Sequence, residues 1–368
     1  ERNRGLAFGK GDVLSVSGEY GVINQIAFQG RSFAGESVAD YHIVGTDDIV
    51  YTKSPLKANP YGIIKVNKGI PGIVSTLYAV YHPLNTVAPR FVDLYFANDL
   101  RLNKFLKPLV NIGAKHDMKV NNSFVLTGTV VFPSISEQQK LVDFFAKLDR
   151  RIEAQRKIVD ALKKYKRGLL NKVFSNINGN IYPTVYLSEV ADFLQGLTYS
   201  PSDVSVAGYL VLRSSNIQNG VLSFDDCVYV DKKVDESLQV KCDDVIMCVR
   251  NGSKKLVGKT ALIPNNMAMT TWGAFMMIIR SKLNDTYIFH YLNSQMFFSQ
   301  VFKDMGTATI NQITKGILNE CKLPLPPETA RKQISKMLSS FDVKIQNAEI
   351  CLTTLVELKK ALLQQLFI

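Results

Sequence analysis

Five short segments of the chain combine basic, hydroxyl and amide side chains. They are residues 213–216, 250–255 and 306–312 in the second half of the chain, and residues 53–59 and 115–119 in the first half. Arg, Asn and Gln can bind the edges of nucleic-acid bases through paired hydrogen bonds, while Lys, Ser and Thr suit phosphate oxygens. The segments are therefore candidate contacts with DNA. A solvated loop or a helix cap remains the alternative for each residue, and residues 213–216 are equally compatible with a structural turn.

The candidate DNA-binding side chains are polar members of these five segments. They are Arg213, Ser214, Asn216, Arg250, Asn251, Ser253, Lys254, Lys255, Thr307, Thr309, Asn311, Gln312, Lys53, Lys57, Asn59, Lys115 and Lys119. A net charge of +12 at pH 7 agrees with an anionic partner. Half of this excess lies on residues 136–176, which contain 11 Lys or Arg and 5 Asp or Glu. A solvated helix face is the alternative explanation of that charge.

Three short patterns resemble parts of catalytic sites but are incomplete. Residues 59–61, Asn-Pro-Tyr, lack one proline of the motif of amino-methyltransferases, and no glycine-rich cofactor loop accompanies them. Residues 5–10 are one residue short of a phosphate-binding loop and lack its Ser or Thr. Glu357 and Lys359 have the spacing of part of a nuclease site without an Asp set beside them. Because these signals do not converge on one chemistry, we expect no catalytic site on this chain.

Cysteine and histidine spacing argues against a metal site. The five cysteines are scattered without a Cys-x-x-Cys pair, whereas a zinc site needs four nearby ligands. An odd, widely spaced set of cysteines indicates reduced thiols, so we expect a cytoplasmic protein. The longest apolar run, residues 274–279, is far too short to span a bilayer. We therefore expect no membrane association.

The chain repeats itself. Residues 133–175 align with residues 326–368 at an offset of 193 and without a gap. The matching pairs are Pro133 and Pro326, Leu141 and Ile334, Asp149 and Asp342, Ile152 and Ile345, Leu162 and Leu355, Lys166 and Lys359, Leu169 and Leu362, and Phe174 and Phe367. A repeat of this length holds a domain of ordinary size and one long helix. The 368 residues are therefore expected to form two such repeats.

Both repeated segments have the apolar pattern of a coiled-coil helix. Apolar residues alternate at four- and three-residue spacing over more than four heptads. The first stripe is Leu141, Phe145, Leu148, Ile152, Val159, Leu162, Leu169 and Val173, with Gln155 and Lys166 as polar members. The second is Ile334, Leu338, Phe341, Ile345, Ala348, Leu352, Leu355, Leu362 and Leu366, with Lys359 as polar member. A lysine buried in such a seam costs stability unless it reaches solvent or a partner.

Both helices also have recognisable beginnings. Ser134 and Glu137 have the spacing of a capping box, and Pro326 and Pro327 precede the second helix. About forty helical residues span roughly 60 Å. Packing the two helices on each other is the simplest way to bury both stripes. The alternative is that each helix packs on its own domain.

The segments that precede the helices also match, at an offset of 196. Residues 47–51 align with 243–247, Gly62 with Gly258, and residues 91–95 with 287–291. Short β-rich runs such as residues 256–263 and 275–280 accompany helical runs near residues 91–106 and 286–303. We therefore expect an α/β (mixed α+β) fold. In it, two similar globular domains alternate with two long antiparallel coiled-coil helices.

This organisation predicts four consecutive parts. They are a first domain over residues 1–132, a spacer helix over 133–176, a second domain over 177–325 and a second spacer helix over 326–368. The second domain opens with residues 186–190, and their counterpart in the first repeat would fall about ten residues before Glu1. We therefore expect the first copy to lack its beginning.

Several motifs resemble those of one known family. Residues 131–139 and 323–328 resemble the "Pro-Leu-Pro-Pro-…-Glu-Gln" start of the spacer helices in the specificity subunits of type I restriction–modification enzymes (the HsdS family). Residues 148–153 and 341–345 resemble the family's "Leu-Asp-x-x-Ile" step, and residues 212–220 and 306–311 resemble two of its loops. The resemblance covers the whole chain. It departs where the first domain lacks both loops and where residues 329–331 replace Glu-Gln-Gln.

The resemblance implies a division of labour between chains. Each globular domain would be a target-recognition domain that reads a short half-site in double-stranded DNA, and the site would be asymmetric because the domains have diverged. The helix pair would act as a ruler for a fixed, unread gap. The helices would dock two methyltransferase subunits, which hold S-adenosylmethionine and methylate adenine, and motor–nuclease subunits would join to cleave unmodified DNA. This chain would hold no cofactor.

Two other functions remain open on the residues alone. The first is a stand-alone adenine methyltransferase or nuclease, which S-adenosylmethionine or a divalent metal bound to the purified chain would favour. The second is a scaffold whose helices recruit proteins without reading DNA. Binding to DNA without sequence preference, in the absence of a methyltransferase partner, would favour the scaffold.

Overall fold

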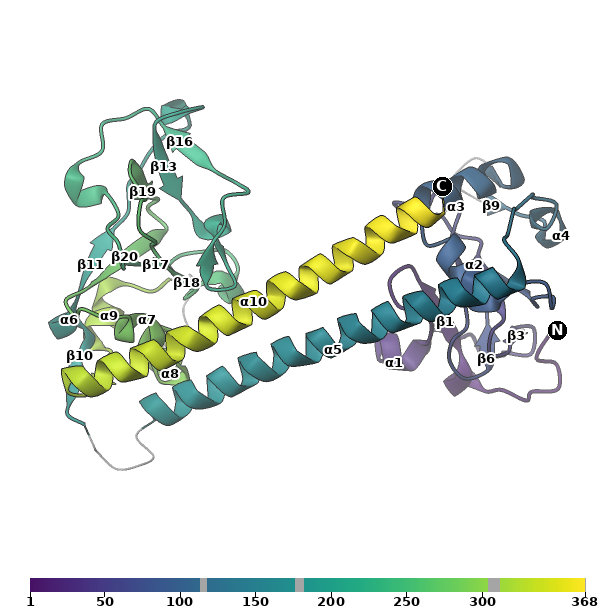
Figure 1. Ribbon diagram of the computed structural model, residues 1–368, viewed down its shortest axis with the longest axis horizontal. Coiled ribbons are helices and arrows are strands. Elements are labelled where there is room, and N and C mark those ends of the chain that lie inside the picture. Colours follow the sequence, from purple (N-terminus) through teal and green to yellow (C-terminus); the bar gives the residue numbers. More distant parts are fainter. Residues whose placement is uncertain (113–117, 176–181, 304–311, 368) are drawn as a thin grey trace. The chain divides into compact units, whose positions relative to one another are not determined.

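The computed structural model describes residues 1–112, 118–175, 182–303 and 312–367 (Figure 1). The chain forms two compact units: unit 1 is Glu1–Arg156 with Cys351–Ile368, and unit 2 is Lys157–Ile350. Two long helices, α5 (Ile135–Phe174) and α10 (Glu328–Leu366), therefore each begin in one unit and end in the other. Each unit contains one globular domain and part of each helix.

The domain of unit 1 is built on a three-stranded antiparallel sheet in the order β5 (Ile64–Val66), β4 (Ile49–Thr52), β7 (Tyr78–Tyr81). Helices α2 (Pro89–Tyr95) and α3 (Asp99–Leu106) cover it, because Val92, Leu102 and Leu106 share one buried core with its strands. The remaining pairs are β1 (Leu14–Ser17) with β2 (Gly21–Asn24), β3 (His42–Val44) with β6 (Gly72–Val74), and β8 (Asn111–Ile112) with β9 (Met118–Lys119). The short helices are α1 (Gln25–Gln29) and α4 (Asn122–Val125).

The domain of unit 2 contains two four-stranded sheets. One has the order β11 (Ala191–Gln195), β20 (Met276–Ser281), β17 (Val245–Cys248), β18 (Thr260–Leu262). The other has the order β12 (Val204–Ser205), β16 (Val228–Val230), β13 (Tyr209–Leu212), β19 (Thr270–Trp272). The pairs are β10 (Thr184–Tyr186) with β21 (Lys322–Pro324) and β14 (Ile217–Gln218) with β15 (Val221–Leu222); the helices are α6 (Leu187–Val190), α7 (Tyr287–Leu292), α8 (Gln295–Val301) and α9 (Lys315–Glu320).

The same strand pairing recurs in the two domains. Strand β4 lies between β5 and β7, and strand β17 lies between β18 and β20. Ile49 pairs with Val66 as Val245 pairs with Leu262, an offset of 196. On the other side, Ile49 pairs with Tyr81 as Val245 pairs with Ile279, so β7 aligns with β20 at an offset of 198. The turns match as well: φ is 67° at Asp47 and 62° at Asp243, and 89° at Gly62 and 88° at Gly258. The expected mixed fold with a repeated domain is confirmed.

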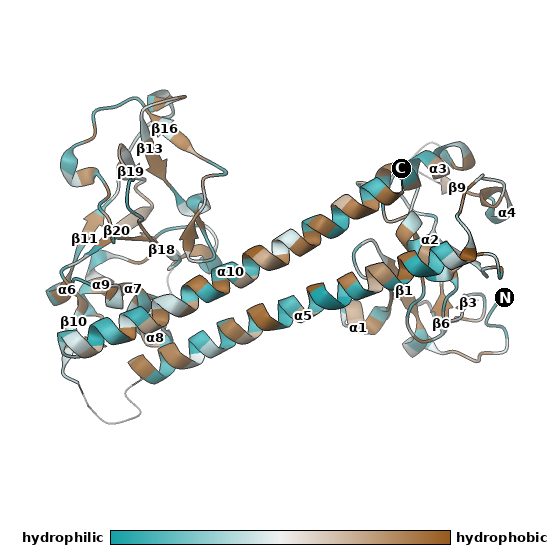
Figure 2. Cartoon of the chain, in the orientation of Figure 1, coloured by the Kyte–Doolittle hydropathy of each residue, from teal (hydrophilic) through white to brown (hydrophobic). Residues whose placement is uncertain are grey.

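The apolar stripes of α5 and α10 are buried or half-buried within each unit, apart from Leu366. Hydrophobic and polar residues alternate along both helices (Figure 2). In unit 1, Phe145 of α5 packs with Phe367 beyond α10; in unit 2, Phe174 of α5 and Leu338 of α10 share one core. Leu366 was expected in the seam but is 49% exposed, whereas Phe367 is 6% exposed. The reason is that Phe367, like the aligned and buried Phe174, packs against aromatic rings of the domain, here those of Phe91 and Tyr95. Among the described residues, no helix is both long and apolar enough to cross a membrane.

Each long helix begins against the domain that precedes it. The predicted capping box is present, because the Ser134 N–H donates to Glu137 Oε2 (3.0 Å) and the Glu137 N–H donates to Ser134 Oγ (3.4 Å). Gln138 is buried and accepts the Ala88 N–H (2.9 Å). At the position aligned with Gln138, Arg331 pairs with Asp285 (2.7 Å). This ion pair accounts for one of the departures seen in residues 329–331.

Each long helix ends against the domain of the other repeat. The Phe174 ring lies 5.1 Å from that of Tyr287 and 5.7 Å from that of Tyr291, between ring centres. The aligned cluster in unit 1 brings Phe367 to 5.6 Å from Phe91 and 6.1 Å from Tyr95. Each domain is thus held by the beginning of its own helix and the end of the other. Both helices are needed to complete each unit.

Candidate nucleic-acid interface

Two of the predicted segments, and the end of a third, meet in unit 2. Residues 213–216 follow β13, and residues 250–255 follow β17. Asn251 Nδ2 donates to Ser214 Oγ (3.3 Å), which joins the first two segments. Gln312 forms an antiparallel β-bridge with Arg250, which brings in the third. The fold therefore gathers Arg213, Ser214, Arg250, Asn251 and Gln312 in one region.

Asn216 builds this region from inside the protein. Its side chain is completely buried, and its Oδ1 accepts the Arg213 N–H (2.9 Å). Its Nδ2 donates to the carbonyls of Ser223 and Asp226, each at 3.0 Å. A buried amide must satisfy its hydrogen bonds within the protein, so Asn216 has none left for a base. The DNA-contact prediction for Asn216 is wrong, and the structural-turn alternative holds for this residue.

Arg213 faces a groove rather than the core. Its guanidinium Nη2 lies 2.8 Å from Asp226 Oδ2, and its side chain remains one-third exposed. The groove is lined by these two residues together with Ser214, Tyr199 and Phe275. It therefore presents a cation, a carboxylate, a hydroxyl and two aromatic rings to whatever enters it.

Arg250 lies next to Phe275, which lines the same groove. The guanidinium carbon of Arg250 is 5.3 Å from the centre of the exposed Phe275 ring. The Phe275 carbonyl accepts N–H bonds from Val249 (3.0 Å) and Arg250 (3.2 Å), which fixes the two side chains side by side. A guanidinium held in this way can offer paired donors to a guanine edge. Sequence analysis missed Phe275 because it lies within an apolar run that is typical of a buried strand.

Lys254 and Lys255 occupy a second groove of unit 2. Both side chains are exposed, and they line this groove with Asn219 and Phe302. The Lys254 ammonium lies 5.8 Å from the centre of the Phe302 ring. Ser253 is exposed, and its backbone N–H is held by Asn251 Oδ1 (3.0 Å). Two exposed ammonium groups beside a serine suit phosphate oxygens rather than base edges.

In unit 1, residues 53–59 follow β4 as residues 250–255 follow β17, so the two loops are equivalent. Lys57 is exposed, and Lys53 Nζ donates to Asn122 Oδ1 (3.4 Å). Burial lowers the pKa of Lys53 below its usual range. Asn59 is buried and its Nδ2 donates to Asp99 Oδ1 (2.9 Å). The prediction for Asn59 is therefore wrong because its side chain is buried, although its Oδ1, unlike that of Asn216, accepts no hydrogen bond within the described residues.

The remaining candidates fall outside what the structure describes. They are Thr307, Thr309, Asn311 and Lys115, together with the side chain of Lys119. Their contact with DNA stays a prediction.

In the described part of the chain, no group of three or more His, Cys, Asp or Glu side chains could hold a metal ion. The nuclease-like pattern belongs to the seam, since Lys359 pairs with Asp149 (2.5 Å).

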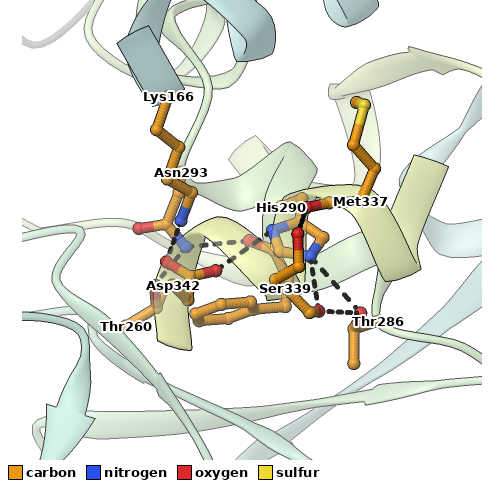
Figure 3. A network of polar contacts seen from close by, with 10 residues as sticks. Lys166, Thr260, Thr286, His290, Asn293, Met337, Ser339 and Asp342 are labelled. Atoms are coloured by element: carbon orange, nitrogen blue, oxygen red, sulfur yellow. Dashed lines mark hydrogen bonds and ion pairs between the residues drawn. The ribbon is translucent and has the colours of Figure 1, made fainter. Parts of the chain in front are cut away.

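A polar network fixes the long helices of unit 2 to the domain that carries these loops (Figure 3). Lys166 of α5 pairs with Asp342 of α10, and the buried His290 of α7 lies beside them. His290 Nε2 is 3.1 Å from Ser339 Oγ and 3.4 Å from Thr286 Oγ1, while Nδ1 is 3.8 Å from Asp342 Oδ2. Burial, and next the charge of Lys166, lower the pKa of His290 to about 3. The neutral imidazole therefore positions the helices.

The fold is thus a tandem repeat. It has two copies of one mixed domain, each with polar loops after its central strand and each joined to a long helix. The family model described as "Type I restriction modification DNA specificity domain" matches residues 182–353. The chain is 26% identical over 190 residues to the specificity subunit of the type I restriction enzyme StySPI of Salmonella potsdam, across 49% of this chain and 40% of that protein. It is 26% identical over 174 residues to the EcoKI specificity subunit of Escherichia coli K12, across 44% and 36%.

A solved structure supports the same fold. A chain from a study of complex assembly and conformational transition of the type I R-M system matches with a TM-score of 0.58 at 16% identity, over 96% of this chain and 89% of that one. The matches to the two curated relatives span about two fifths of their length. The family model therefore identifies a type I restriction–modification DNA specificity domain in residues 182–353, and both curated relatives are specificity subunits of type I restriction enzymes.

Proposed function

We propose that this chain is the sequence-specific DNA-binding subunit of a type I restriction–modification complex. It reads a bipartite, asymmetric site in double-stranded DNA, one half-site with each globular domain. One observation carries this proposal: the two domains share strand register at β4 and β17 but differ in the loops that follow those strands. Two different half-sites require different side chains at the base edges, because each base is recognised by the hydrogen bonds that a particular side chain can form. Two domains with the same strands but different polar loops meet this requirement.

The asymmetry is clearest after the first aligned strand. The parallel bridge between Val13 and Ile73 in unit 1 matches the pairing of Val211 with Thr271 in unit 2, at an offset of 198. On this alignment the position of Arg213 is taken by Ser15, which is buried. The groove cation of unit 2 therefore has no counterpart at that position in unit 1. The two domains cannot read the same bases there.

The long helices support the role of a rigid spacer. Ile152, Val159 and Leu355 are buried along the seam. The two lysines of the seam form ion pairs between the helices: Lys166 pairs with Asp342 in unit 2, and Lys359 pairs with Asp149 in unit 1. Helices packed by heptads resist bending more than an open linker does. We infer that they hold the two half-sites at a fixed, unread gap.

The helices also carry exposed apolar side chains at equivalent positions in each unit, and we infer that those of one unit form one docking surface. In unit 1 the exposed side chains are Phe144 and Leu358; in unit 2 the aligned residues Met337 and Tyr165 are exposed. Large apolar residues exposed outside a seam support docking of a protein partner. Because the surface occurs once in each repeat, it fits two copies of one partner. We assign these to two adenine methyltransferase subunits that hold S-adenosylmethionine, with motor–nuclease subunits joining the complex.

Co-expression tests this function. The full chain is produced with the methyltransferase encoded beside it, and methylated adenines are mapped in the host DNA. We expect a two-part motif with a constant unread gap, and only when both chains are present. Methylation by the methyltransferase alone, or an absence of any new motif, would contradict the proposal.

Variants of the docking surface separate recognition from partner binding. Phe144→Glu combined with Met337→Glu should abolish methylation while the purified chain still binds DNA, because both side chains lie on the helices and outside the loops. The matched control is Gln346→Glu, an exposed polar position on α10. If Gln346→Glu lowers methylation as much as the double variant does, these surfaces are not the docking sites of the methyltransferase.

A further inference from the structure

Asp226 places a carboxylate in the groove of unit 2, where it contacts Arg213. The two side chains are 2.8 Å apart, and Asp226 remains 63% exposed. An ion pair this exposed contributes little to stability. A carboxylate also repels DNA phosphates, so it does not serve general affinity for DNA. The position of Asp226 therefore calls for another explanation.

The pair is held in place before any ligand arrives. The buried Asn216 side chain accepts the Arg213 backbone N–H and donates to the Asp226 backbone carbonyl. One amide thus fixes both residues from below and leaves both side chains directed into the groove that they line. A preorganised pair needs little ordering when it binds.

The chemistry of the pair complements one base-pair edge. In the major groove a G·C pair presents two acceptors, guanine N7 and O6, followed by one donor, the cytosine N4 amino group. Arg213 offers two donors, and Asp226 offers an acceptor beside them. The 2.8 Å separation of the Arg213 nitrogen and the Asp226 oxygen is close to the spacing of guanine O6 and cytosine N4, which are hydrogen-bonded to each other at about 2.9 Å. An A·T pair presents a donor between two acceptors and does not match.

We propose that Arg213 and Asp226 together read one G·C base pair in the half-site of unit 2. Arg213 donates to guanine, and Asp226 accepts from the amino group of cytosine. This inference rests on the proposed function and adds the base pair that the groove selects. Since Ser15 takes the place of Arg213 in unit 1, the half-site of unit 1 serves as a control within the same molecule.

The test compares base preference at every position of the motif. The full chain, wild type or variant, is co-expressed with the methyltransferase, and methylated motifs are mapped. We expect Asp226→Asn and Arg213→Lys each to relax one G·C position in one half-site by roughly tenfold to a hundredfold. The other half-site should not change. Asp226→Asn preserves the fold because the Asp226 backbone carbonyl, not its side chain, is bound by Asn216.

The matched control is Asp225→Asn, which makes the same charge change one residue away, at an exposed carboxylate that accepts the Ser223 hydroxyl (2.8 Å). Identical motifs for wild type, Asp225→Asn and Asp226→Asn would overturn the inference and leave the proposed function standing. No motif with wild type would overturn both.

A modified duplex isolates the contact of Asp226. Once the motif is known, its cytosine is replaced by 2-pyrimidinone, which pairs with guanine but lacks the amino group. Wild-type binding should weaken by roughly tenfold, whereas Asp226→Ala should be indifferent to the replacement. Equal weakening for both proteins would show that Asp226 does not contact the cytosine.

Discussion

Lys166 on α5 forms an ion pair with Asp342 on α10, and the chain contains the same pair a second time. In unit 1, Lys359 on α10 pairs with Asp149 on α5. The two pairs are related by the repeat offset of 193, with the helices exchanged. Each helix was expected to carry one lysine in the seam. The other helix supplies the aspartate that pairs with this lysine, and the ion pair offsets the free energy lost when the lysine is buried.

The two pairs should differ in stability. The Lys166 side chain is 13% exposed and that of Lys359 is 28% exposed, and Asp342 already has one buried oxygen without a hydrogen bond. Lys166→Met should lower the free energy of unfolding by about 1–3 kcal/mol, and Lys359→Met by about 1 kcal/mol or less. Urea unfolding measures both. Exchanging Lys166 and Asp342 in one double variant should recover part of the loss. Equal losses for the two methionine variants would contradict this account.

His290 should make stability depend on pH. Its pKa in the folded protein, about 3, lies below its ordinary value of 6.5, so the unfolded chain binds more protons than the folded one between these values. Stability is therefore complete above pH 6.5 and is lost as pH falls. We expect a loss of about 2 kcal/mol between pH 6.5 and pH 5. His290→Leu, which copies the aligned Leu94 of unit 1, should remove this slope. If the free energy of unfolding of this variant still falls between pH 6.5 and pH 5 as in the wild type, then groups other than His290 cause the pH dependence.

Arg250 should contribute to discrimination rather than to general affinity. Arg250→Ala should lower the preference for the specific site by about 1–3 kcal/mol at one position. Phe275→Ala should cause a smaller loss at the same position, since the ring holds the guanidinium. Lys254→Ala is the comparison, and it should weaken specific and random duplexes alike and reduce the salt dependence of binding. If Arg250→Ala behaves like Lys254→Ala, then Arg250 is a phosphate contact.

The phenylalanines at the helix ends should stabilise different units. Phe174→Ala should destabilise unit 2, and Phe367→Ala should destabilise unit 1, each by about 3–5 kcal/mol. Hydrogen exchange resolved along the chain would locate the change. We expect faster exchange in α7 for the first variant and in α2 for the second, because the rings contact Tyr287 and Phe91. The packing of each helix end on the domain of the other repeat would be contradicted if hydrogen exchange became faster only in the repeat that carries the substitution.

The spacer can be lengthened without disturbing its seam. Inserting one heptad after Arg156 and one at the aligned position after Glu349 preserves the apolar stripes. Seven helical residues add about 10 Å, or about three base pairs. The mapped motif should keep both half-sites and change its unread gap. An identical gap would remove the ruler role.

Much of this organisation could be predicted because it is local or periodic. The heptad stripes and the Ser134–Glu137 capping box depend on neighbours within a few residues. The self-alignment at an offset of 193 then predicted two domains and two helices, and the shared register of β4 and β17 agrees with it.

The sequence by itself determined the repeat, the periodic helices and the polar loops that suit DNA. Tertiary structure decided which side chains in those loops are free. Asn216 and Asn59 have the same side chain as Asn251, yet the fold buries the first two and leaves the third partly accessible. Phe275 and Asp226 gained their candidate roles only by proximity to Arg250 and Arg213. Pairs such as Arg213 with Asp226 and Asn59 with Asp99 have no fixed spacing in the sequence, so a local pattern could not show them.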